Sequence, residues 1–115
     1  AESARKLLGG PAPGPARRVG FDDVISAAAA EVGVSSRELK ARDRRPAVVW
    51  GRQLAMYLAR ELTGASFPDI GRAFGGRNHT TVLHAVRRVE RELERDQGTR
   101  SAVDSLVTSL GGPRS

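Results

Sequence analysis

Residues 66–89 read SFPDIGRAFGGRNHTTVLHAVRRV, and they contain the start signals of two helices. Ser66, followed three residues later by Asp69, has the pattern of a capping box at the start of a short helix. The glycine pair 75–76 then breaks that helix, and Asn78 is a favoured N-cap residue for a longer second one. Two helices joined by a tight glycine turn predict a helix-turn-helix.

The second of these helices has an apolar face and a polar face. At about 100° per residue its apolar residues fall on one side, and they are Val82, Val86, Val89 and Leu93. The opposite side carries short hydrogen-bonding groups near its start and arginines farther on: Thr80, His84, Arg87 and Arg91, flanked by His79, Thr81 and Arg88. Small polar groups can reach base edges in a major groove, and cations behind them can meet phosphates. This pattern favours a DNA-reading helix over the alternative, a solvated polar face.

The rest of the chain is also helical in pattern. We expect one helix over residues 21–32, ended by Gly33, and a short one after a capping box at Ser35 and Glu38. A longer helix is expected from Pro46 to Thr63, ended by Gly64, and a last one from Thr99 or Ser101 onward. No segment alternates polar and apolar residues as a half-buried strand does, so an all-α fold is predicted. Since only 4% of the residues are aromatic, the core must be aliphatic.

The chain has 115 residues, the size of one small domain. Residues 9–20 combine prolines and glycines with other small residues, which is typical of a linker. We therefore expect a helical stub at 1–8, the linker at 9–20, the helix-turn-helix domain at 21–111 and a flexible tail at 112–115. No apolar run approaches the roughly 18 residues that a membrane span needs.

The charge of the chain is concentrated in its middle. Nineteen basic residues exceed thirteen acidic ones, and residues 37–88 alone hold eleven basic and four acidic residues. Within this part, Arg42, Arg44 and Arg45 form a short basic loop, which suits a narrow, A·T-rich minor groove. This local excess of positive charge predicts a polyanion partner. The alternatives are an arginine-rich composition without such a role and a loop that is merely solvated.

The sequence argues against catalysis. Cysteine is absent, which excludes a disulfide scaffold, a thiol nucleophile and a cysteine-based metal site. His79 and His84 lie about 140° apart on a helix, so they cannot hold one metal from one face. No lysine precedes the threonines after the glycine pair, as a phosphate-binding P-loop requires. His84 and Arg87 match the H-x-x-R box of tyrosine recombinases, but the only tyrosine, Tyr57, lies upstream of that box.

Two segments resemble a known family. Residues 71–85 read GRAFGGRNHTTVLHA and closely resemble the C-terminal signature of the bacterial chromosomal replication initiator DnaA. Residues 52–58 read RQLAMYL and resemble the middle helix of the same domain. The resemblance covers about residues 20–111, and it implies a compact, TrpR-like helical domain that binds an asymmetric, A·T-rich box in double-stranded DNA.

The resemblance also implies where and how such a module works. It implies a cytoplasmic, nucleoid-associated domain that recognises a replication origin, is monomeric when isolated and does not bind a membrane. It implies no cofactor in this chain, because ATP would belong to an AAA+ domain that the chain lacks. The alternatives left open are a stand-alone transcriptional regulator with the same domain, an RNA-binding or protein-docking module, and a recombinase fragment.

The family's functional residues can be carried onto this sequence. The minor-groove reader falls on Arg44, and the major-groove readers fall on Asn78, His79, Thr80, Thr81 and His84. The contacts to the DNA backbone fall on Arg42, Arg45, Arg52, Gln53, Pro68, Arg77, Arg87 and Arg88. Two positions depart from the family, which usually has aspartate at Asn78 and proline at Gly51. Asparagine can donate a hydrogen bond as well as accept one, which leaves open the base preference at the base pair that Asn78 contacts. Gly51 is expected to loosen the start of the middle helix.

Overall fold

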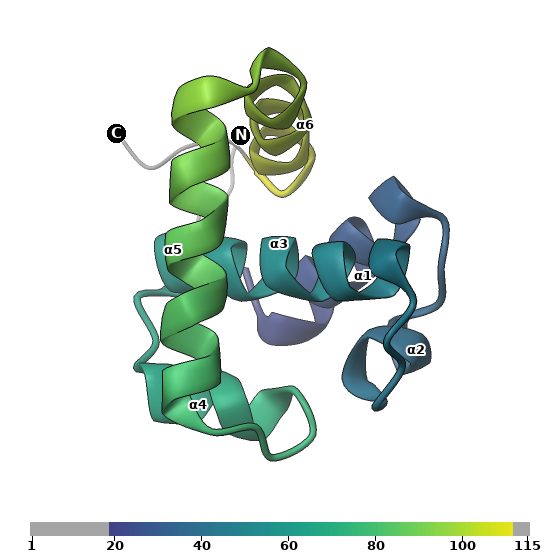
Figure 1. Cartoon of the computed structure of the whole chain (residues 1–115), viewed down its shortest axis with the longest axis vertical. Helices are drawn as coiled ribbons and strands as arrows, with labels where there is room; N and C mark the ends of the chain where they lie inside the picture. Colours follow the sequence, from purple (N-terminus) through teal and green to yellow (C-terminus); the bar gives the residue numbers. More distant parts are fainter. Residues whose placement is uncertain (1–18, 112–115) are drawn as a thin grey trace, which may run out of the picture.

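The computed structural model describes residues 19–111, and across them the protein consists of six α-helices without a strand (Figure 1). In chain order the helices are α1 (Phe21–Val32), α2 (Ser36–Lys40), α3 (Pro46–Thr63), α4 (Phe67–Ala73), α5 (His79–Arg95) and α6 (Gln97–Ser109). The all-α prediction is confirmed for this part of the chain. The stub at 1–8, the linker up to residue 18 and the tail at 112–115 lie outside the described residues.

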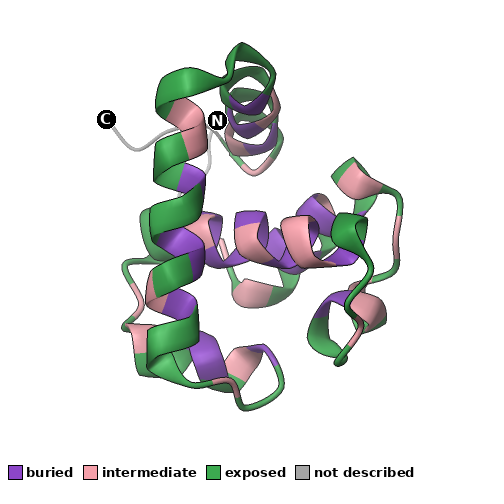
Figure 2. Ribbon diagram, in the orientation of Figure 1, coloured by how far each residue is buried: buried purple, intermediate pink, exposed green. Residues whose placement is uncertain are grey.

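Helix α3 runs through the middle of the molecule. Helix α1 packs against it, α5 crosses it, and α6 packs against α1 and α5. Figure 2 shows buried residues concentrated along α3 and on the face of α5 that crosses it. The fully buried side chains of this core are almost all aliphatic, as expected, and Phe74 is the largest of them.

Most helix ends follow local signals in the sequence. Gly33 and Gly64 end α1 and α3 with φ angles of 78° and 69°, in the left-handed region that glycine favours. At the start of α2 the capping box is reciprocal, because the backbone N of Glu38 donates to Ser35 Oγ at 3.1 Å and the backbone N of Ser35 donates to Glu38 Oε1 at 2.7 Å. These boundaries confirm the predictions.

One predicted helix start is wrong, and one predicted capping box is only half formed. Helix α6 begins at Gln97, because the Asp96 carboxylate accepts from the backbone N of Thr99 at 3.0 Å and from its hydroxyl at 2.6 Å. The expected start at Thr99 or Ser101 is therefore too late. At α4, Ser66 Oγ accepts from the backbone N of Asp69 at 3.2 Å, but the Asp69 carboxylate pairs with Arg72 instead of closing the box.

Gly51 lies in the second turn of α3, beyond the helix start that it was expected to loosen. It is buried, and a Cβ atom there would lie 2.6 Å from Val32 Cγ2 and 3.1 Å from Leu39 Cδ2. The missing side chain therefore allows α3 to pack closely against the end of α1 and against α2.

Candidate nucleic-acid interface

The turn between α4 and α5 has a geometry that requires glycine. Gly75 and Gly76 have φ angles of 81° and 80°, which L side chains rarely adopt. The backbone N atoms of Gly76 and Arg77 donate to the carbonyl oxygen of Gly71 at 3.1 and 2.8 Å. A Cβ atom on Gly71 would lie 2.1 Å from the carbonyl oxygen of Arg77. The glycines thus close the turn, and the predicted helix-turn-helix is present.

The apolar face of α5 is buried, and this turns its polar face outward. Val82, Val86 and Val89 are buried as predicted, and Leu93 at the far end is half-buried. The side chains expected to read bases are all exposed at the start of the helix: Asn78, His79, Thr80, Thr81 and His84.

Asn78 caps α5 with its amide oxygen, because Oδ1 accepts from the backbone N of Thr80 at 2.7 Å. The polar atom left over on this side chain is therefore Nδ2, which only donates. The first turn of a helix also has unpaired N–H groups with partial positive charge. The start of α5 consequently offers hydrogen-bond donors to a partner.

The basic loop, residues 41–45, presents three exposed arginines, Arg42, Arg44 and Arg45. Within residues 19–111, Arg42 and Arg44 have no carboxylate oxygen within 4.0 Å. Arg45 differs, since its Nη2 lies 2.7 Å from Asp43 Oδ2 and it also pairs with Glu38. Hydrogen bonds from Arg45 lower the pKa of Asp43 to about 2. Arg42 and Arg44 thus carry the unpaired charge of the loop.

Arg52 and Arg77 contact the protein's own backbone. Arg52 is only 9% exposed, and it donates from Nε to the Leu39 carbonyl at 2.8 Å and from Nη2 to the Ala41 and Asp43 carbonyls, each at 2.9 Å. Arg77, half-buried in the helix-turn-helix turn, donates from Nη2 to the same Ala41 carbonyl at 2.6 Å and from Nη1 to the Lys40 carbonyl at 3.2 Å. Arg52, expected at the DNA backbone, therefore has little surface for a phosphate.

These two guanidinium groups bring the basic loop and the helix-turn-helix together. Burial and then the charge of Arg77 lower the pKa of Arg52, and burial and then the charge of Arg42 lower the pKa of Arg77. The positive charge of Arg77 is therefore repelled by that of Arg42, and the charge of Arg52 by that of Arg77. A Cβ atom on Gly75 would lie 2.7 Å from the Lys40 carbonyl oxygen, so the turn packs against the end of α2, directly before the loop.

The remaining candidates for DNA contact lie on exposed or half-buried positions of α3, α4 and α5. Arg88 donates from Nη1 to Gln53 Oε1 at 2.9 Å, and its guanidinium carbon lies 5.1 Å from the centre of the Trp50 ring. Arg87 and Pro68 are exposed. A recess of about 210 Å³ lies between α3 and α5 beside these residues, and its lining includes Arg52, Gln53, Arg77, Thr81 and His84.

A family model described as the bacterial dnaA protein helix-turn-helix matches residues 21–89. The chain belongs to this family. The chromosomal replication initiator protein DnaA of Caulobacter vibrioides (strain NA1000 / CB15N) is 45% identical over 96 residues, which are 84% of this chain and 20% of that relative. The DnaA protein of Agrobacterium fabrum is 53% identical over 77 residues, which are 67% of this chain and 16% of that relative.

The DnaA relatives are much longer than this chain. The DnaA protein of Rhodopseudomonas palustris (strain HaA2) is 45% identical over 98 residues, 85% of this chain but 21% of the relative. This chain thus spans about a fifth of the length of the curated relatives it matches. The family model covers the basic loop and the helix-turn-helix, and α6 lies beyond the matched residues.

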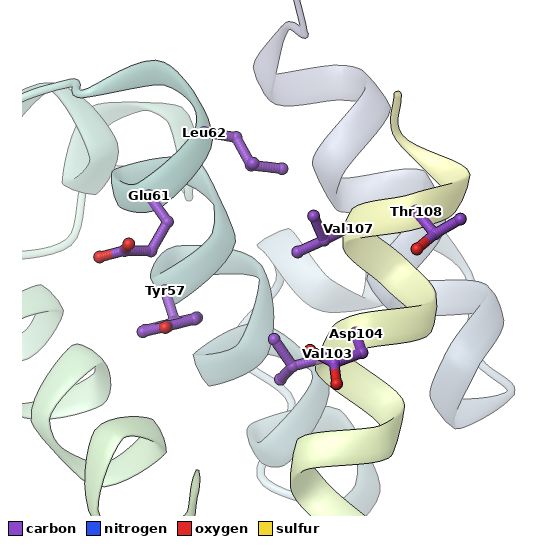
Figure 3. Close-up of a pocket in the computed structure, with 7 residues that line it drawn as sticks. All are labelled: Tyr57, Glu61, Leu62, Val103, Asp104, Val107 and Thr108. Atoms are coloured by element: carbon purple, nitrogen blue, oxygen red, sulfur yellow. The ribbon is translucent and has the colours of Figure 1, made fainter. Parts of the chain in front are cut away.

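A separate groove of about 490 Å³ lies between α3 and α6 and holds the only tyrosine of the chain. Figure 3 shows Tyr57 and Glu61 on α3 beside Val103 and Asp104 on α6. Burial and then the charges of Glu61 and Glu90 raise the pKa of Tyr57, which disfavours the phenolate that nucleophilic attack requires. His84 lines the other recess, so the recombinase arrangement is not assembled.

Residues 19–111 lack two other kinds of functional feature. No helix there is both long and apolar enough to cross a bilayer. No three histidine, aspartate or glutamate side chains gather there as a metal site requires.

The contact of Arg52 with the basic loop was not predicted from the sequence, although one signal was present. Arg52 lies four residues after Val48 and three before Ala55, and both of these are fully buried. An arginine at this spacing falls within the buried stripe of α3. A buried arginine must find acceptors inside the protein, and carbonyl groups at the end of a neighbouring helix are the ordinary ones.

Proposed function

We propose that this chain is the DNA-recognition module of a replication initiator and binds DnaA-box-like sites in double-stranded DNA. Its family is defined by the helix-turn-helix, and its relatives are chromosomal replication initiator proteins. The proposed role is binding rather than catalysis. The excess of basic residues over residues 37–88 supports a polyanionic partner.

The start of α5 enters the major groove in this proposal. A major groove about 12 Å wide admits an α-helix, whose first residues then contact base edges. The five exposed side chains there are short and polar, which suits base reading: Asn78, His79, Thr80, Thr81 and His84. The threonine methyl groups can also contact the methyl group of thymine.

Arg44 enters the neighbouring minor groove. A·T-rich minor grooves are narrow and strongly negative, and they attract an inserted arginine. The observation that carries the proposal is the 2.6 Å hydrogen bond from Arg77 Nη2 to the Ala41 carbonyl, because it joins the turn before α5 to the loop that holds Arg44. Two reading elements held against each other can act on adjacent grooves of one duplex.

Phosphate contacts complete the proposed interface. Exposed or half-buried residues around the two readers are candidates: Arg42, Arg45, Gln53, Pro68, Arg77, Arg87 and Arg88. Such contacts hold the protein in register without reading sequence. Arg45 must first exchange its carboxylate partners for a phosphate, so we expect it to contribute less than Arg42.

Selection of bound sequences from a random duplex library tests the proposal. We expect recovery of one asymmetric, A·T-rich consensus site. Competition with single-stranded DNA and with RNA of the selected sequence is the control. No enrichment of any duplex, or equal binding to the single strands or RNA, contradicts the proposal.

A further inference from the structure

We propose that Arg52 is a positioning residue for minor-groove recognition: its guanidinium holds the basic loop so that Arg44 reaches the minor groove while α5 occupies the major groove. The inference rests on the proposed function. It replaces the phosphate contact that the resemblance implies for Arg52 with a role inside the protein.

The hydrogen bonds of Arg52 fix the loop at two points and the end of α2 at a third. Helix α2 ends at Lys40, and the last carbonyl groups of a helix lack partners within that helix. Arg52 donates to the carbonyl groups of Leu39 and Ala41 at this end and to that of Asp43 beyond it. One rigid, planar group thus holds the backbone up to the residue directly before Arg44.

The burial of Arg52 shows how strongly this arrangement depends on the carbonyl groups. The residue is 9% exposed, and within residues 19–111 its guanidinium has no carboxylate oxygen within 4.0 Å. A buried charge without a carboxylate must be stabilised by hydrogen bonds. Lysine carries the same charge as a single ammonium group and cannot reproduce the planar fork of donors. Arg52→Lys therefore keeps the charge and removes the geometry.

The positioning role and a phosphate contact predict different losses. If Arg52 met a phosphate, its removal would weaken all duplexes alike and reduce the salt dependence by about one charge. If Arg52 positions Arg44, its removal should weaken discrimination only at base pairs read from the minor groove. A general loss of folding would lower the fraction of active protein and leave every affinity ratio unchanged.

The experiment measures affinities of the full chain for the selected site and for two variants, by fluorescence anisotropy. One variant changes an A·T pair read by Arg44 to G·C, and the other changes a pair read by α5. The proteins are wild type, Arg44→Ala, Arg52→Lys and the double variant. Arg60→Lys is the matched control, because Arg60 is also on α3 and donates to a backbone carbonyl, that of Ala65 at 2.9 Å, away from the loop.

We expect Arg52→Lys to reduce minor-groove discrimination roughly fivefold or more and to leave major-groove discrimination and the salt slope unchanged. In the double variant, the loss of minor-groove discrimination should equal that of Arg44→Ala alone. Arg60→Lys should match wild type. If circular dichroism shows that Arg52→Lys unfolds at the assay temperature, Arg52→Met, which removes the buried charge, takes its place. Unchanged discrimination, or losses that add to those of Arg44→Ala, overturn the inference and leave the proposed function intact. A wild-type protein without any discrimination overturns the proposed function itself.

Discussion

Arg77 donates from Nη2 to the carbonyl oxygen of Ala41 at 2.6 Å, across 36 residues of sequence. Arg77 lies directly before Asn78, the N-cap of α5, and Ala41 begins the basic loop. This one hydrogen bond therefore joins the two elements that we propose to read DNA. In Figure 1 both elements lie at the lower end of the molecule, opposite α6.

The first prediction compares two neighbouring glycines. Gly75 and Gly76 have nearly the same φ angle, but only Gly75 packs against the Lys40 carbonyl oxygen, whereas nothing lies within 4 Å of a Cβ atom on Gly76. Gly76→Ala should lower the free energy of unfolding by about 1–2 kcal/mol through backbone strain. Gly75→Ala should cost roughly 1–3 kcal/mol more through overpacking and should also weaken DNA binding more. Urea denaturation measures the difference, and equal costs would show that the turn does not press on the end of α2.

The second prediction concerns the base that Asn78 faces. Its Oδ1 caps α5, so Nδ2 is the atom available to a base, and it should select an acceptor such as a purine N7. Asn78→Asp keeps the cap but offers a second acceptor oxygen, so the preference at that step should move toward a base with an amino group. Selection with wild type and with the Asn78→Asp variant measures this. An identical consensus from the two proteins would mean that this side chain reads no base.

The third prediction concerns acid. Arg45 lowers the pKa of Asp43 from 3.8 to about 2, and hydrogen bonds with Ser35 and Arg45 also lower that of Glu38. A carboxyl group whose pKa is lowered by folding stabilises the folded state at pH values above its ordinary pKa. This stabilisation is lost as the pH falls through the pKa of the folded state. The melting temperature should therefore fall between about pH 4 and pH 2, and Arg45→Met should reduce the part of that fall due to these carboxyl groups. A pH profile unaffected by Arg45→Met would contradict this.

The fourth prediction concerns salt. If six to ten phosphates are met, the logarithm of the affinity should fall with the logarithm of salt concentration at a slope of about −5 to −9. Arg42→Ala and Arg87→Ala should each reduce the magnitude of that slope by about one. Arg100→Ala is the control, because Arg100 lies on α6 and donates to the Leu93 carbonyl. A slope near zero for wild type, or equal changes in all three variants, would argue against these contacts.

Local signals made most of the fold predictable. The box at Ser35 and the N-cap at Asn78 act within one helical turn, so their residue types are sufficient to locate a helix start. The start of α6 was misjudged because Asp96 ends α5 and caps α6 at once. Its signal is hidden in a run of charged residues that also suits the end of α5.

The candidate site was predictable only in part. The exposed face of α5 follows from periodicity alone, since burying the valines turns the polar side chains outward. The roles of Arg52 and Arg77 do not follow, because their partners are backbone carbonyl groups distant in sequence, and carbonyl groups leave no pattern of residue types. A resemblance shows that an arginine recurs, but not whether its guanidinium faces a phosphate or the protein's own loop.

Recognition of adjacent grooves by Arg44 and α5 is tested most directly by replacing each A·T pair of the selected site by inosine·cytosine and, separately, by G·C. Inosine lacks the 2-amino group, so inosine·cytosine keeps the minor-groove face of A·T but has the major-groove face of G·C. We predict two adjoining blocks of base pairs. In the block read from the minor groove, inosine·cytosine is tolerated and G·C is not, and Arg44→Ala removes that difference. In the block read from the major groove, both replacements weaken the binding of wild type. Equal effects of inosine·cytosine and G·C at every pair, or a tolerant block that survives Arg44→Ala, would contradict recognition of adjacent grooves by Arg44 and α5.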